Sequence, residues 1–577
     1  MLINIPRLRE APAAFGLCRA LLLTLLLSLL ASCGPRGDGG PGTGASVTDV
    51  PDADGPALVL LVVVDQLRGD FMDVYGDRLA DDGLGLLAGR GVHYVNAEYR
   101  HGITSTAPGH ATLVTGAPPS VHGIVGNEWV DPITATRVYC VADDEHRILG
   151  EETELRDGVS PGNLQAQSIG DLLVEARGGA ARVFGISLKD RGAILPAGRL
   201  GKAFWYSRRT GRFVTSDYYY RREPGWLTGF NDAGSVDAFR ERRWNLLRDV
   251  SDYRYASRDD QPWERGYKGL GRVFPHELAA TGDDYYSALR YTPFSDELTL
   301  DATLAMIDAE GIGQSGGTDI LAISLSATDY IGHAFGPESL EAEDNLFRLD
   351  RVIAQLLAAV DQRVGLDRTL VVLTSDHGIE SAPELQLRRG EDVGRVDVPG
   401  MIERVNAGVA AAFDLEFDAV IRFNNPALYL NAGALERAGV AVADIEREVA
   451  RIAANEPGIA LALPATDVLA EDSTDPLKQL ARASLWPSRT GLVYLVQVPG
   501  WHLHAIPDLQ AVMHGSPYRY DTHVPILVSM PGIEPRVIDR SVGVEQIAPS
   551  IAALLGLPPL AQATGEALPE LRRPAPR

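Results

Sequence analysis

The amino-acid sequence predicts an α/β fold with a doubly wound, mostly parallel sheet and cap insertions. Five short apolar runs, rich in β-branched residues, have the composition of strands buried on both faces. They lie at 58–64, 182–188, 319–325, 369–374 and 525–528. Apolar residues recur at helical spacing in the segments between them, at 164–176, 296–309 and 344–364. Strands that alternate with helices indicate a sheet with helices on both faces.

Residues 1–32 are typical of an export signal, because basic residues precede a leucine-rich run too short to span a bilayer comfortably. The segment Leu30-Ala-Ser-Cys33 resembles the bacterial lipobox, in which the cysteine becomes the lipidated first residue. The alternative is an ordinary signal peptide with an incidental cysteine. Residues 33–56 have the Gly, Pro and Ser content of a flexible tether. We expect an exported lipoprotein, anchored to a membrane through Cys33 and located in the periplasm or at the outer membrane.

The chain has a formal net charge of −24, which would repel the phosphate backbone of DNA or RNA. We therefore expect no nucleic-acid partner, and an anionic substrate would need local positive charge. Cys140 is the only cysteine left after signal removal and lipidation of Cys33, so no internal disulfide is expected.

The main domain is predicted to span 57–562. Two stretches interrupt the alternation of strands and helices, at about 200–295 and 380–510, and we interpret both as insertions. The end of the chain, 563–577, is rich in Pro and Arg and is expected to be loose.

Acidic and imidazole side chains follow the predicted strands, where the active sites of open α/β sheets lie. They are Asp65, Asp329, His333, Asp376, His377 and His523. Any one of them has a simpler explanation, as a helix cap or a structural histidine. Together they form the oxygen and nitrogen ligand set that Zn²⁺ prefers when thiolates are absent.

Thr106 lies in the segment Thr104-Ser-Thr-Ala-Pro-Gly-His110, which precedes a helix-like stretch. Pro108 marks a helix start, so Thr106 is placed near a helix N-terminus, where anions are favoured. A hydroxyl activated there by a metal could attack phosphorus. The alternative is that Thr106 only caps the helix.

The order of these motifs along the chain resembles the alkaline phosphatase superfamily. Within it, the chain is similar to the phosphate-irrepressible alkaline phosphatases, relatives of the type I phosphodiesterases and nucleotide pyrophosphatases. The resemblance implies two Zn²⁺ ions and a phosphothreonine intermediate on Thr106. It assigns one ion to Asp329, His333 and His523, and the other to Asp65, Asp376, His377 and Thr106. His514 competes with His523 as the last ligand, and the motif around His523 favours the latter.

Three further residues resemble groups that bind phosphoryl oxygens in the phosphate-irrepressible enzymes: Asn127, Lys189 and Arg191. A monoester dianion presents more charged oxygens than a diester and rewards extra donors. The sequence therefore favours a broad-specificity phosphate monoester hydrolase that scavenges phosphate. The alternatives are a phosphodiesterase or nucleotide pyrophosphatase with the same metals, and a non-catalytic binding protein. A sulfatase is disfavoured because its nucleophile derives from Cys or Ser, not Thr.

Overall fold

The computed structural model describes residues 55–571, except 133, 153–156, 279–282 and 507–508. The predicted signal peptide, the lipidation site Cys33 and all but the last two residues of the predicted tether lie outside the described residues. Among the helices that are described, none combines the length and the apolar character needed to cross a bilayer.

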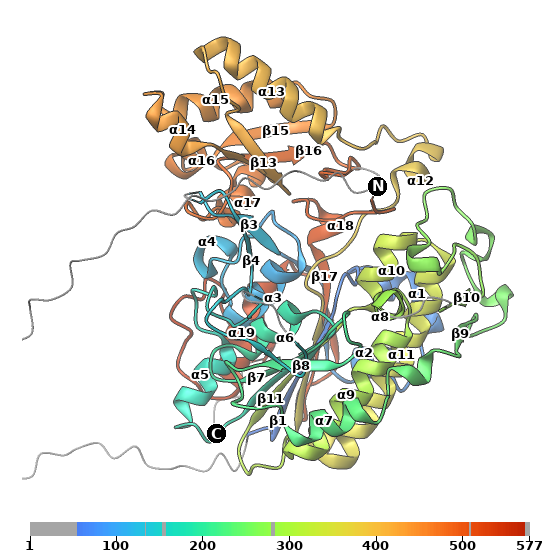
Figure 1. Cartoon of the computed structure of the whole chain (residues 1–577). Coiled ribbons are helices and arrows are strands. Elements are labelled where there is room, and N and C mark those ends of the chain that lie inside the picture. Colours follow the sequence, from blue (N-terminus) through green and yellow to red (C-terminus); the bar gives the residue numbers. More distant parts are fainter. Residues whose placement is uncertain (1–54, 133, 153–156, 279–282, 507–508, 572–577) are drawn as a thin grey trace, which may run out of the picture. The chain divides into compact units, whose positions relative to one another are not determined.

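A large sheet of eleven strands forms the centre of the structure (Figure 1). Its middle strands are parallel, and they run in the order β12-β1-β11-β6-β7. Their bounds are Thr369–Thr374, Leu58–Val64, Asp319–Leu325, Val183–Ser187 and Lys202–Tyr206. The predicted doubly wound fold is confirmed. The fifth predicted strand, β17 (His523–Ser529), is antiparallel to both of its neighbours, β12 and β2 (Val92–Glu98).

Helices cover both faces of this sheet (Figure 1), and the alternation of side chains along β1 shows how. Leu58, Leu60, Val62 and Val64 face one apolar core, which includes α9 (Phe294–Glu310) and α11 (Leu340–Arg363). The residues between them face a second core, which includes α5 (Ile169–Ala176) and α19 (Ile547–Leu554). A strand buried on both faces gains from apolar residues at every position, and this explains the continuous apolar run.

The first predicted insertion begins later than expected. β7 and β8 (Phe213–Ser216) both belong to the central sheet, so the inserted segment starts after β8. It contains α7 (Gly225–Asp232) and α8 (Asp283–Leu289), and a short pairing of β9 (Arg243–Trp244) with β10 (His276–Glu277).

The second predicted insertion has a sheet and an apolar core of its own. Four antiparallel strands run in the order β13-β14-β16-β15, with bounds Val420–Asn424, Ala427–Leu430, Val493–Gln497 and Ile459–Pro464. Two of its helices, α13 (Val398–Phe413) and α15 (Val442–Ala453), pack on the same core.

The prediction of a loose tail from residue 563 is wrong for its described part. Leu568 and Leu571 are buried in the core beside α19, and the Thr564 amide donates to the Gly116 carbonyl. Burial of these two leucines holds the segment on the domain as far as residue 571.

Candidate active site

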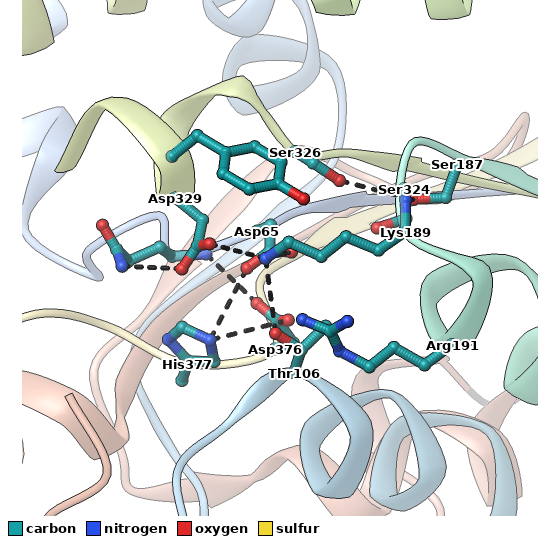
Figure 2. A network of polar contacts seen from close by, with 12 residues as sticks. Asp65, Thr106, Ser187, Lys189, Arg191, Ser324, Ser326, Asp329, Asp376 and His377 are labelled. Carbon is teal, nitrogen blue, oxygen red and sulfur yellow. Dashed lines mark hydrogen bonds and ion pairs between the residues drawn. The ribbon is translucent and has the colours of Figure 1, made fainter. Parts of the chain in front are cut away.

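Four neighbouring parallel strands deliver polar side chains to one edge of the sheet. Asp65 follows β1, Asp376 follows β12, and Lys189 follows β6. Asp329 follows β11 on α10 (Ala327–Phe335). The carboxyl ends of parallel strands meet at the same edge, so residues far apart in sequence converge there (Figure 2).

The helix α10 carries two of the predicted ligands one turn apart. Asp329 Oδ1 lies 3.2 Å from His333 Nε2, as the four-residue spacing predicted. The Asp296 carboxylate accepts hydrogen bonds from the Ser326 and Ala327 amides at 3.0 and 3.1 Å, which fixes the start of this helix.

Thr106 is the first residue of α3 (Thr106–Thr115) and is almost fully buried. It does not cap the helix, because Ser105 occupies the cap position and no side-chain cap bond forms there. Its hydroxyl instead accepts a hydrogen bond from Lys189 Nζ at 3.4 Å. Gly109 allows the approach of α3 to the neighbouring loop, since a Cβ there would lie 2.1 Å from the Asp376 carbonyl oxygen.

Lys189 Nζ lies at the centre of the acidic cluster, 2.6 Å from both Asp65 Oδ2 and Asp329 Oδ2. Asp376 is a third buried carboxylate, and its Oδ2 makes no hydrogen bond with any described residue. One ammonium against three carboxylates leaves the cluster negative, and uncompensated buried charge is costly. The cluster therefore fits bound cations.

The three carboxyl groups respond differently to this environment. Burial raises the pKa of Asp65 well above its ordinary value, and the charge of Asp376 adds to the shift. Burial acts in the same direction on Asp329, but Lys189 and His333 outweigh it and hold its pKa well below the ordinary value. The pKa of Asp376 is likewise lowered against burial, by His377 and then His110. Two of the three carboxylates thus stay ionised as metal ligands must.

Three histidines direct their Nε2 atoms toward these carboxylates because their Nδ1 atoms are engaged elsewhere. Nδ1 of His333, His377 and His514 lies within 2.8–2.9 Å of a backbone carbonyl oxygen. Such bonds fix the tautomer of metal-binding histidines and leave Nε2 as the ligand atom. Burial lowers the pKa of His377 and, further, that of His514, so both imidazoles are neutral as ligation requires.

Two groups of these residues have the spacing of metal ligands. In each group the candidate ligand atoms lie within 4.8 Å of one another: Asp65, Asp376 and His377 in one, Asp329, His377 and His514 in the other. His333 adjoins the second group through Asp329 and through the His514 ring, 4.9 Å away between centroids. Two adjacent ligand sets are what a two-metal site requires, and in the first set Asp376 Oδ2 and His377 Nε2 have no hydrogen-bond partner among the described residues.

The structure does not bring His523, the predicted last ligand, to the candidate ligands, and His514 lies among them instead. His514 Nε2 lies 3.6 Å from Asp329 Oδ1, and its ring stacks on His377 with centroids 3.7 Å apart. The His523 imidazole bonds through Nε2 to the Val95 carbonyl on the adjacent strand, at 2.8 Å. Its ring packs against Gly69, outside both ligand groups.

The remaining predicted residues flank Thr106. Asn127 Oδ1 accepts from the Ala107 amide at 2.9 Å, so its side chain is held beside the start of α3. Arg191 is partly buried, and Figure 2 shows its guanidinium pointing toward Thr106. Its Nη1 donates to the Tyr139 hydroxyl at 3.3 Å, while its Nε has no partner among the described residues.

Comparison with known proteins identifies the family. The model of the type I phosphodiesterase/nucleotide pyrophosphatase family matches residues 59–517, most of the chain. The chain belongs to this family.

The chain is 31% identical to the alkaline phosphatase PhoV of Synechococcus elongatus. That match covers 89% of this chain and 93% of PhoV. The chain is also 32% identical to a protein of Myroides odoratus named calcium-transporting ATPase, over 87% of this chain and 92% of that protein.

The crystal structure of the alkaline phosphatase PafA has a similar fold, with a TM-score of 0.84 and 31% identity over 90% of this chain and 99% of PafA. A second PafA structure carries substitutions of a threonine, an asparagine, a lysine and an arginine. Those four positions have the same order and spacing along the chain as Thr106, Asn127, Lys189 and Arg191.

Sequence reasoning missed two residues that organise the site. Gln66 has a positive φ of 70° and bridges two carboxylates: its amide donates to Asp376 and its side chain to Asp329. His110 Nδ1 lies 3.3 Å from Asp376 Oδ2. Gln66 directly follows Asp65 at the end of β1, and His110 belongs to the motif that contains Thr106. Their closeness in sequence to predicted site residues was the only indication of their role.

Proposed function

We propose that this protein hydrolyses phosphate monoesters, with the Thr106 hydroxyl as the nucleophile. The observation that carries the proposal is the environment of that hydroxyl. It lies at a helix N-terminus and receives a hydrogen bond from Lys189, whose ammonium also contacts the buried carboxylates of Asp65 and Asp329. The names of PhoV and PafA, each about a third identical over most of the chain, support phosphatase activity.

The ligand set supports two divalent cations, and we propose Zn²⁺ for both. Asp65, Asp376, His377 and Thr106 would hold one ion. Asp329, His333 and His514 would hold the other. Ions bound there supply positive charge that favours an ionised hydroxyl and an ionised water at neutral pH.

The chain's own groups account for the remaining chemistry. The Thr106 oxygen forms a bond to phosphorus as the bond to the leaving alcohol oxygen breaks, which gives a phosphothreonine and an alcohol that takes up a proton. Water then attacks the phosphothreonine, phosphate leaves, and Thr106 regains its hydroxyl. Lys189 and Arg191 offset the negative charge of the phosphoryl group through both steps.

The preference for monoesters depends on Asn127, Lys189 and Arg191. Donors around the third charged oxygen stabilise a bound dianion, whereas a diester places a second substituent there. The matching order and spacing of the four substituted PafA positions supports a shared site. The family match keeps a phosphodiesterase as the second candidate, because members are described by that activity.

Phosphate scavenging from many esters is the physiological role we propose, because the groups assigned to the site recognise phosphate. We further propose that the protein is exported and anchored through lipid on Cys33, on the strength of the Leu30-Ala-Ser-Cys33 motif alone.

The deciding experiment compares kcat/KM for an aryl phosphate monoester with that for the matching methyl aryl diester, on protein of measured metal content. A large preference for the monoester supports the proposal. A preference for the diester supports the second candidate. Turnover of neither ester by metal-loaded protein would favour a non-catalytic binding protein on this scaffold.

A further inference from the structure

Arg290 is a partly buried cation whose guanidinium contacts two tyrosine rings. It follows α8 in the inserted segment and is partly exposed at the surface. Its Nη1 donates to the Tyr330 hydroxyl at 3.0 Å, and its guanidinium carbon lies 4.9 Å from the centroid of that ring. The ring of Tyr291 is 5.9 Å away. Within the described part of the chain it makes no ion pair with a carboxylate.

Tyr330 connects Arg290 to the site that holds Thr106. It follows Asp329 directly on α10, and Lys189 Nζ lies 5.1 Å from its ring centroid. Both cations therefore lie against one ring, and they can be at most about 10 Å apart. Tyr291 is also near the site, since its ring centroid lies 5.1 Å from that of Tyr330.

Arg240 is another arginine of this segment that contacts tyrosine rings, and it has an acidic partner. The Arg240 guanidinium lies 3.8 Å from the Tyr285 ring and forms an ion pair with Asp237 at 2.7 Å. Contact with an aromatic ring therefore does not require an arginine to lack an acid. A guanidinium that loses water without gaining an anion is costly, and its planar set of donors matches a carboxylate or a phosphate.

We propose that Arg290 and Tyr330 form a second anion-binding site, which recognises an oxyanion on the leaving group of the substrate. The separation from Lys189 suits a compact monoester that carries a carboxylate or a second phosphate. In a chain with a net charge of −24, such a substrate would otherwise be disfavoured. This inference rests on the proposed phosphatase function and adds a preference for doubly anionic monoesters.

The test uses three aryl monoesters that differ only at the far end: para-(carboxymethyl)phenyl phosphate, its neutral carbamoylmethyl analogue and its phosphonomethyl analogue. The methylene insulates the phenol oxygen, so leaving-group reactivity is closely matched. We expect the wild-type protein to prefer at least one anionic substrate by about tenfold in kcat/KM, which corresponds to about 1.4 kcal/mol. The anion that is preferred identifies the chemistry of the ligand.

Arg290→Gln should bring the anionic-to-neutral ratio close to one, and Arg290→Lys should retain part of the preference. Arg240→Gln is the matched control and should keep the wild-type ratio. Equal kcat/KM for all three substrates in the wild-type protein would overturn the inference without any variant. An unchanged ratio in Arg290→Gln, or the same loss in Arg240→Gln, would also overturn it. Absence of turnover on every substrate would instead count against the proposed function.

Discussion

Arg191→Ala should reduce monoester hydrolysis much more than diester hydrolysis. The guanidinium is partly buried, makes one long hydrogen bond to Tyr139, and has no partner at Nε among the described residues. It therefore retains donors for a phosphoryl oxygen. A hydrogen bond to a charged group contributes about 1.5–3 kcal/mol, and two such bonds set the upper range. Allowing for water that fills the space, we expect a loss of about 3 kcal/mol, or roughly 10²-fold in kcat/KM.

The assay measures kcat/KM for an aryl monoester and its methyl diester with the wild type, Arg191→Ala and a control. The diester lacks the third charged oxygen, so its loss should stay below about tenfold. Arg199→Ala is the control, because Arg199 lies just after the same helix, α6 (Asp190–Ala197), and bonds a backbone carbonyl of Leu164. Equal losses on both esters in Arg191→Ala would refute the assignment of Arg191 to the phosphoryl group.

Three further changes test other parts of the site. Thr106→Ala should lower kcat by roughly 10³-fold or more with little change in Tm, and near-normal turnover would place the nucleophile elsewhere. His514→Ala should lower bound zinc from about two ions per chain toward one, whereas His523→Ala should retain both; the reverse pattern would restore His523 as the ligand. Cys33→Ser should move the exported protein from the membrane fraction to the soluble fraction, and continued membrane association would show that another anchor holds it.

The parallel strands could be predicted closely because burial on both faces leaves an unbroken apolar run. β1, β11 and β12 have the predicted bounds, and the ends of β6 lie within one residue of them. The site residues after these strands followed from the same logic, since parallel strands end at one edge.

The choice between His514 and His523 could not be made from local sequence. His523 is the first residue of β17, and its side chain hydrogen-bonds to the Val95 carbonyl on the neighbouring strand β2. His514 lies in a stretch without regular structure between β16 and α18 (Arg519–Thr522). Local periodicity does not predict the position of such a stretch. The ring of His514 is oriented by contacts with residues distant in sequence, the Thr104 carbonyl and the His377 ring.

The boundaries of the insertion and of the tail were wrong for a related reason. β7 is a continuation of the central sheet, but the tyrosine- and arginine-rich segment after it dominates the composition of the stretch. The tail packs through Leu568 and Leu571, two apolar residues among prolines and charges. They are buried against α19, and the sequence of the tail alone does not show that this helix lies beside it.

The covalent role of Thr106 is tested most directly by the stereochemistry of phosphoryl transfer. A monoester made chiral at phosphorus with oxygen isotopes is incubated with the protein and an acceptor alcohol, and the configuration of the product is determined. Two successive in-line displacements, the first by Thr106, predict retention of configuration. Inversion would mean that the acceptor attacks the substrate directly, and it would contradict the phosphothreonine intermediate.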